Sequence, residues 1–157
     1  MPRSIGDRLP AGLRSFLDGT DLRGGEGRTF LLVTSGPDWP HVAMLSVGEV
    51  LATNDREIRI ALWPGTTSTA NLTASGRAVL MAIVDDAVHF VRLACRRGAD
   101  LELSQGKRAF VIASVADVLE DRVTYAQMTS ALAFRLVDRE ATIPRWEETI
   151  AALRRGH

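Results

Sequence analysis

Four hydroxyl side chains follow one another where an apolar run ends: Thr66, Thr67, Ser68 and Thr69. Pro64-Gly65 comes just before them and marks a sharp turn, and residues 67–76 can form a short helix. The first backbone N–H groups of a helix lack intrahelical acceptors and carry partial positive charge. Hydroxyls at such a place can donate to an anion, so the run predicts a phosphate-binding turn. The alternative is a simple N-cap, for which a single Ser or Thr is enough.

The other reactive residue types form no recognisable catalytic set. Cys95 is the single cysteine, which excludes a disulfide framework and a multi-thiolate metal site, and its apolar surroundings indicate a buried small side chain. The histidines at 41, 89 and 157 are far apart and show no zinc-binding spacing, so no metal is predicted. Catalytic residues therefore stay unassigned.

Composition limits the partners. The 157 residues carry 19 basic and 19 acidic side chains, so no net field favours nucleic acid or a membrane surface. All basic residues except Lys107 are arginines, which suit phosphate and carboxylate, although a compositional bias of the genome would give the same skew. The first residues lack a signal-peptide core, and no apolar run reaches ~18 residues. We therefore expect a cytoplasmic protein with one domain over 1–157.

A β-rich body must position the hydroxyl run. Apolar or alternating runs separated by turn signals predict its strands. The segment 107–121 fits one bent strand, but a helix over 113–120 satisfies the same pattern, whereas 98–106 looks like a short connection. The segment 131–138 is strand-like and is placed to close the sheet. The expected strands are 28–35, 41–47, 49–54, 58–63, 77–85, 87–97, 107–121 and 131–138.

Helices are expected at both ends of the chain and at the hydroxyl run. Residues 10–18 and 67–76 have helical spacing, and residues 143–155 show the clearest apolar stripe, formed by Ile143, Trp146, Ile150 and Leu153. So few crossover helices exclude a doubly wound fold, and many short strands favour a closed or partly closed antiparallel barrel.

The order of these motifs resembles the FMN-binding split-barrel superfamily of pyridoxamine 5′-phosphate oxidase-like proteins. The carrying stretches are W-P-H-V-A-M-L-S on one strand, then a hairpin, the hydroxyl run, and N-L-x-x-S-G-R-A-x-L, over roughly residues 28–120. The resemblance implies a mainly β fold: a six-stranded antiparallel split β-barrel with one internal short helix and terminal helices.

The resemblance also implies where FMN would bind. The family's loop has a Ser two residues before a Lys or Arg, and both contact the phosphate; here these places fall on Thr67 and Thr69, with Ser68 between them. Thr69 thus replaces a cation by a neutral hydroxyl, which weakens the hold on a phosphate dianion. The missing charge would come from an arginine on a neighbouring strand: Arg59, Arg77 or Arg92.

In this family the flavin ring lies against the strand that carries the first motif. His41, Met44 and Ser46 are the candidates to line that side, and Trp63 is placed to stack on the ring. Three of these four residues have a structural alternative. Met44 would pack in the core, His41 would begin a strand at the surface, and Trp63 would cover the barrel rim.

The function implied by the resemblance is an FMN-dependent oxidoreductase acting on a small-molecule substrate that the sequence does not identify. The alternatives are a reductase of the same fold that binds the deazaflavin F420, and a non-catalytic barrel that binds a flavin or another small ligand. The resemblance further implies a homodimer with cofactor sites at its interface. Apolar stretches at 89–95 and 131–137, which one small barrel would have to cover alone, agree with a dimer.

Overall fold

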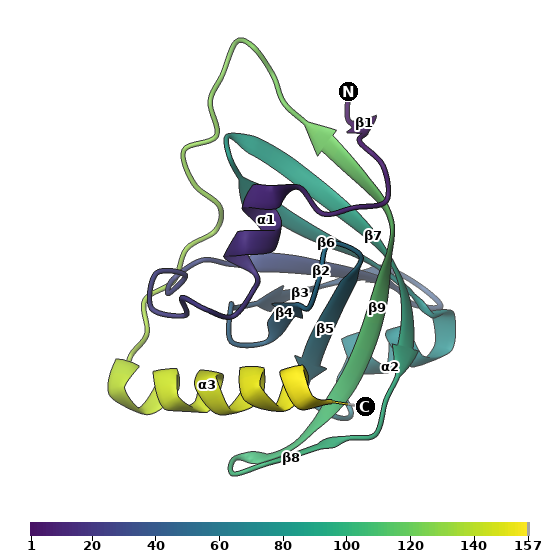
Figure 1. The fold of residues 1–157 in the computed structure, drawn as a ribbon. Coiled ribbons are helices and arrows are strands. Elements are labelled where there is room, and N and C mark those ends of the chain that lie inside the picture. The colour runs from purple at the N-terminus through teal and green to yellow at the C-terminus, as the bar shows by residue number, and fades with distance from the viewer. Residues whose placement is uncertain (157) are drawn as a thin grey trace.

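The computed structural model describes residues 1–156, and its centre is a curled antiparallel sheet flanked by helices (Figure 1). The main path of the sheet runs in the order β3-β2-β6-β7-β9-β5-β4, and β1 and β8 each pair with β9. The strands are β1 (Arg3–Ser4), β2 (Phe30–Ser35), β3 (Pro40–Leu45), β4 (Val50–Ala52), β5 (Glu57–Leu62), β6 (Arg77–Val84), β7 (Ala87–Arg97), β8 (Leu101–Leu103) and β9 (Gly106–Asp121). The helices are α1 (Ala11–Phe16), α2 (Thr67–Ser75) and α3 (Arg139–Arg155).

This architecture confirms the predicted mainly β antiparallel barrel with a short internal helix and end helices. The strand count was too low, because residues 1–156 form nine strands rather than six. Part of the difference is the expected connection at 98–106, which contains β8 and turns back onto β9 as a hairpin.

The ambiguous segment 107–121 lies within one long strand, β9. Arg92 of β7 pairs with Asp117, but Leu93 pairs with Val115, so Ala116 is an extra residue in β9. Such a bulge bends a strand and increases its twist. The bend lets β9 pair with both β7 and β5, and a helix over 113–120 is excluded.

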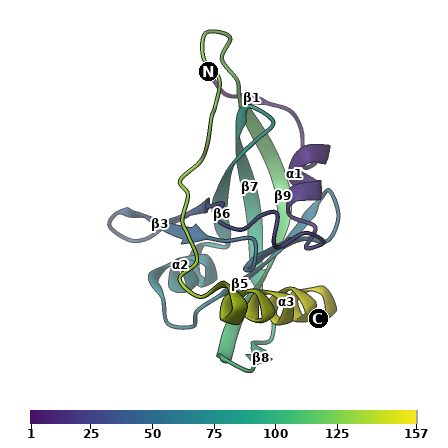
Figure 2. The ribbon, with the colours of Figure 1, turned by 90° about the vertical axis from the view of Figure 1, so that its left-hand side faces the viewer.

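The prediction of a closing strand at 131–138 was wrong. This part of the chain is irregular and crosses the outside of the sheet between β9 and α3 (Figures 1 and 2). Its one bridge joins Ala133 to Arg28. Both sides of β2 are paired, with β3 and β6, and the segment meets that strand line only at Arg28, just before β2 begins. A strand needs a free edge, which local sequence does not show.

Helix α3 packs through the predicted stripe. Ile143, Trp146, Ile150 and Leu153 are all buried, and Asp138 caps the start of the helix by accepting the N–H of Ala141 at 3.0 Å. The helix therefore begins four residues before the predicted 143. Burying large apolar side chains contributes roughly 1.5–3 kcal/mol each.

The sheet is apolar on both of its faces. Its inner face holds the core, whereas the registers align Met44, Leu31, Met81 and Phe90 in one row across β3, β2, β6 and β7 on the outer face. Met44 is 70% exposed. An antiparallel sheet with a solvated face normally carries polar residues there. We call the following residues the outer apolar face: Leu31, Val33, Val42, Met44, Val79, Met81 and Phe90.

His89 is the one histidine of residues 1–156 that lies in the interior, 2% exposed on the inner side of β7. Its Nε2 lies 3.5 Å from a carboxylate oxygen of Glu120, and its Nδ1 has no hydrogen-bond partner among these residues. Burial lowers the pKa of His89 from its ordinary value of 6.5, and the charge of Glu120 offsets part of this effect. The imidazole is therefore held neutral.

Stability is expected to fall as the pH is lowered below about 6.5, because unfolded His89 takes up a proton there and folded His89 resists it. The unfolded state then binds more protons, so the free energy of unfolding rises with pH through this window. Urea unfolding of wild type, His89→Gln and the control His41→Gln, at a histidine that is only half-buried, measures the slope between about pH 5.5 and 7. His89→Gln should flatten it and His41→Gln should not; equal slopes in all three would contradict the prediction.

No helix of the described residues is both long enough and apolar enough to span a bilayer.

Candidate functional site

The hydroxyl run caps helix α2. The Thr66 hydroxyl accepts the N–H of Thr69 at 3.3 Å, and the Oγ1 atoms of Thr66 and Thr69 lie 3.0 Å apart. Both hydroxyls also donate to the carbonyl of Trp63, at 3.2 and 2.9 Å. The helix ends at Gly76, whose φ of 65° is the left-handed conformation typical of a helix C-cap. Two of the four hydroxyls are thus occupied by the turn itself.

The other two hydroxyls differ in exposure. Ser68 is buried and its Oγ has no hydrogen-bond partner among residues 1–156. Thr67 is exposed, and no described group bonds its hydroxyl. Because the cap takes the N–H of Thr69, the backbone N–H groups of Thr67 and Ser68 are left without an acceptor in the described chain. An anion at the start of α2 would therefore meet Thr67 and these two N–H groups.

The three arginines proposed to supply charge to the phosphate differ in the partners that they already bind. Arg59 is occupied, because its Nη1 donates to the carbonyls of Leu153 and Gly156 at the end of α3. Arg92 pairs with Asp117 at 3.3 Å. Arg77 is exposed and has no ion-pair partner among residues 1–156. Arg77 remains the available cation of the three.

Arg77 and the hydroxyl run lie at opposite ends of α2. The helix has nine residues, so its ends are about 13 Å apart. One phosphate cannot contact both, although one larger ligand can. Arg77 instead borders a hollow of about 360 Å³ on the outer side of the sheet, together with Val33, Ser35, Val79 and Arg92. This hollow adjoins the outer apolar face.

The predicted ring-contacting residues around β3 separate into two environments. His41 is half-buried opposite Thr34, whereas Met44 points outward opposite Leu31, so core packing does not explain Met44. Ser46 lies beyond the strand and is buried. Its N–H and hydroxyl both donate to a carboxylate oxygen of Glu49, at 2.6 and 3.1 Å. Of these three side chains, Met44 has the free surface that a ligand on the outer face requires.

Trp63 is covered by an arginine that the sequence did not single out. The guanidinium carbon of Arg108 lies 3.3 Å from the centre of the Trp63 ring. The pair borders a cavity of about 140 Å³ together with Glu49, which precedes β4, and with Arg145 and Trp146 of α3. Burial raises the pKa of Glu49. One face of the Trp63 ring is thus taken, and a flavin would have to use the other.

Cys95 behaves as the sequence predicted. Its thiol is partly buried on β7, and burial raises the pKa of Cys95 to about 11. At neutral pH the nucleophilic thiolate is therefore scarce.

Two sequence comparisons show the family of this chain. Residues 30–144 match the model for the N-terminal domain of DUF447, a protein family of unknown function. The protein YclD of Bacillus subtilis strain 168 is 35% identical over 144 residues, which are 91% of this chain and 94% of YclD. The chain belongs to the DUF447 N-terminal domain family. The matched region of this DUF447 domain begins at β2, ends within α3 and includes every predicted cofactor-contacting residue.

Solved structures show the fold of the DUF447 domain. A HupZ variant from Group A Streptococcus superposes with a TM-score of 0.56 at 7% identity, covering 72% of this chain and 99% of its own. A candidate pyridoxamine 5′-phosphate oxidase from Lactobacillus delbrueckii gives 0.56 at 12% identity, covering 75% and 98%. The DUF447 domain of this chain has the same fold as these two proteins, a split antiparallel barrel. At these identities the likeness concerns the fold alone.

Proposed function

We propose that this chain binds FMN and is an oxidoreductase of the pyridoxamine 5′-phosphate oxidase-like type acting on a small molecule. The observation that carries the proposal is the start of α2, where the exposed Thr67 hydroxyl and two free N–H groups form a donor set for a phosphate. A second support is the hollow beside Arg77 on the outer face, whose apolar floor fits a flat ring.

The residues at the start of α2 can hold the phosphate of such a cofactor. We expect them to hold it weakly, because neutral donors stand where the FMN-binding superfamily has a cation. The flavin would supply the redox chemistry, hydride transfer at its N5 atom. The chain's own residues then need only bind, orient and select. Thr67 and the N–H groups of α2 hold the phosphate, and the outer face positions the ring. Hydride transfer to a flavin requires no obligatory side-chain acid or base.

We further propose that the protein is a homodimer joined through the outer apolar face. Contiguous exposed apolar surface of this kind marks interaction sites in soluble proteins. A second copy on this face would cover Val42 and Met44, and it would enclose the hollow beside Arg77. The cofactor sites would then lie at the interface.

FMN is expected to bind Thr67→Ala about 1–2 kcal/mol more weakly than wild type, the scale of a lost hydrogen bond to a charged group. Riboflavin, which lacks the phosphate, should bind both proteins equally. Quenching of flavin fluorescence measures the two affinities. Thr67 suits this test better than Thr69, because Thr69 also holds the turn and its loss would disturb the helix.

Arg77→Met is the matched variant for the other possible position of the phosphate. If the phosphate lies beside Arg77 instead, this variant should weaken FMN selectively and Thr67→Ala should not. Equal effects of both variants on FMN and riboflavin would show that neither residue contacts a phosphate. A protein that binds neither flavin would refute the proposed function and leave a barrel of another kind.

A further inference from the structure

The irregular segment 122–138, called here the strap, is fixed to the body at two points. At one end the N–H of Met128 donates to the Asp86 carboxylate at 2.6 Å. At the other end the N–H of Phe134 donates to the carbonyl of Gly27 at 3.0 Å, and Ala133 bridges to Arg28. Connections of this length without secondary structure are uncommon inside compact domains and are often functional.

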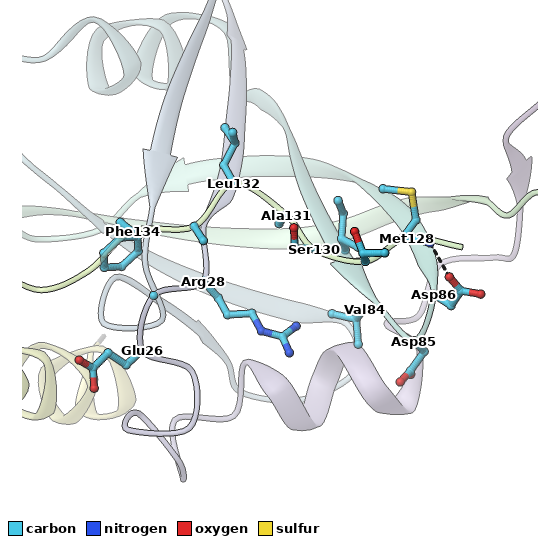
Figure 3. A pocket seen from close by; sticks show the side chains of 14 residues that line it. Glu26, Arg28, Val84, Asp85, Asp86, Met128, Ser130, Ala131, Leu132 and Phe134 are labelled. Carbon is cyan, nitrogen blue, oxygen red and sulfur yellow. Dashed lines mark hydrogen bonds between the residues drawn. The ribbon is translucent and has the colours of Figure 1, made fainter. Parts of the chain in front are cut away.

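Between these two points the strap roofs a cavity of about 480 Å³ (Figure 3). This volume is in the range of small-molecule sites. Ile83 and Val84 of β6 form its apolar floor, and Thr129 and Ser130 contribute hydroxyl groups from the roof. Leu132 is 61% exposed at its edge. The cavity thus combines apolar surface with hydrogen-bond donors.

Arg28 carries the only positive charge among the lining residues, and Figure 3 shows its side chain extending into the cavity. Its guanidinium also lies 4.9 Å from the centre of the Phe16 ring, which supports it from one side. No carboxylate of residues 1–156 forms an ion pair with it. The charge is therefore held in place without a counter-charge.

The three carboxylates of the lining are directed elsewhere (Figure 3). Glu26 pairs with Arg139 of α3, and Asp86 accepts the N–H of Met128. Asp85 approaches α1 so closely that a Cβ on Gly12 would lie 1.9 Å from its Oδ2. Asp85 and Asp86 keep their negative charge but face the rim of the cavity, so the charged group that extends into it is the guanidinium of Arg28.

We propose that this cavity binds a small organic carboxylate with a compact apolar body. Arg28 holds the carboxylate bidentately, the strap's hydroxyl and N–H groups donate to it, and Val84, Leu132 and Phe134 cover the apolar part. One guanidinium matches a monoanion, whereas a phosphate dianion would call for a second cation. The site needs neither a flavin nor the start of α2, so it stands apart from the proposed function.

Benzoate is expected to bind the full chain at least roughly 10-fold more tightly than benzamide, which has the same shape without the charge. Arg28→Met, which keeps length and removes charge, should abolish this preference. Arg28→Lys should retain part of it, and Arg23→Met, an exposed arginine outside the cavity, should leave it unchanged. Isothermal titration calorimetry measures the affinities, and thermal unfolding shows whether each variant is folded.

Hydrogen exchange gives a second reading, because benzoate should slow exchange over 128–134 and benzamide should not. Two results would overturn the proposal. One is the absence of benzoate binding to wild type at millimolar concentrations. The other is an unchanged preference in both Arg28 variants, which would place the carboxylate elsewhere.

Discussion

Replacing Trp146 by alanine is expected to lower the free energy of unfolding by about 3–5 kcal/mol. Its indole is buried between α3 and the turn after β3, where a Cβ on Gly48 would lie only 2.1 Å from the ring. Phe134 of the strap meets it edge-on, with ring centres 6.4 Å apart. The substitution therefore leaves a cavity between α3, the turn after β3 and the strap.

Trp39→Ala is the matched control, since Trp39 is 82% exposed and its loss should change stability by less than about 0.5 kcal/mol. Urea unfolding followed by circular dichroism compares the three proteins. A loss below about 1 kcal/mol for Trp146→Ala would show that α3 is peripheral to the fold.

Met44→Glu is expected to convert a dimer into monomers, raising the dissociation constant roughly 100-fold or more. Met44 is exposed within one chain, so the substitution should leave the monomer folded. In the proposed dimer, however, it would bury an unpaired charge at the centre of the outer apolar face, which costs about 3–5 kcal/mol.

Val137→Glu controls for added charge, because Val137 is exposed on the strap and is not one of the residues that form that face. Sedimentation equilibrium should give a dimer for wild type and Val137→Glu and a particle near 17.1 kDa for Met44→Glu. Wild type that sediments as a monomer at micromolar concentration would contradict the dimer.

Local signals predicted much of this fold, because they act over a few residues. Pro64-Gly65 and Gly76 bracket α2 as expected, and the stripe of α3 is buried as its spacing indicates. The closing strand failed because pairing depends on where the segment lies relative to the sheet, and it meets the sheet only at Arg28, which the sequence at 131–138 cannot reveal.

The contacts of the candidate site were harder to predict, because they too depend on segments that are distant in the sequence. Arg108 reaches Trp63 because it precedes Ala109, which pairs with Leu62 from a distant strand. The local sequence indicates that Arg59 is an exposed arginine on a strand. In the structure its guanidinium instead donates to the carbonyl of Leu153 at the end of α3. The hydroxyl run predicted a turn with hydroxyls available to a ligand. Which hydroxyl is available depends on the exact residue at which α2 begins, and the sequence does not give that residue.

The tight turn between β6 and β7 has a consequence for how the molecule folds. Asp85 and Asp86 both adopt positive φ, 54° and 60°, a conformation that Asn-Gly would take more readily. One aspartate lies close to α1 and the other accepts the N–H of Met128 in the strap, so one two-residue turn meets two segments that lie more than a hundred residues apart in the sequence. Asp86 and Met128 are 42 positions apart, and contacts between distant positions are expected to form late in folding because their loop-closure entropy must be overcome first. The first helix and the strap should therefore gain and lose their order together, as one cooperative unit controlled by that turn.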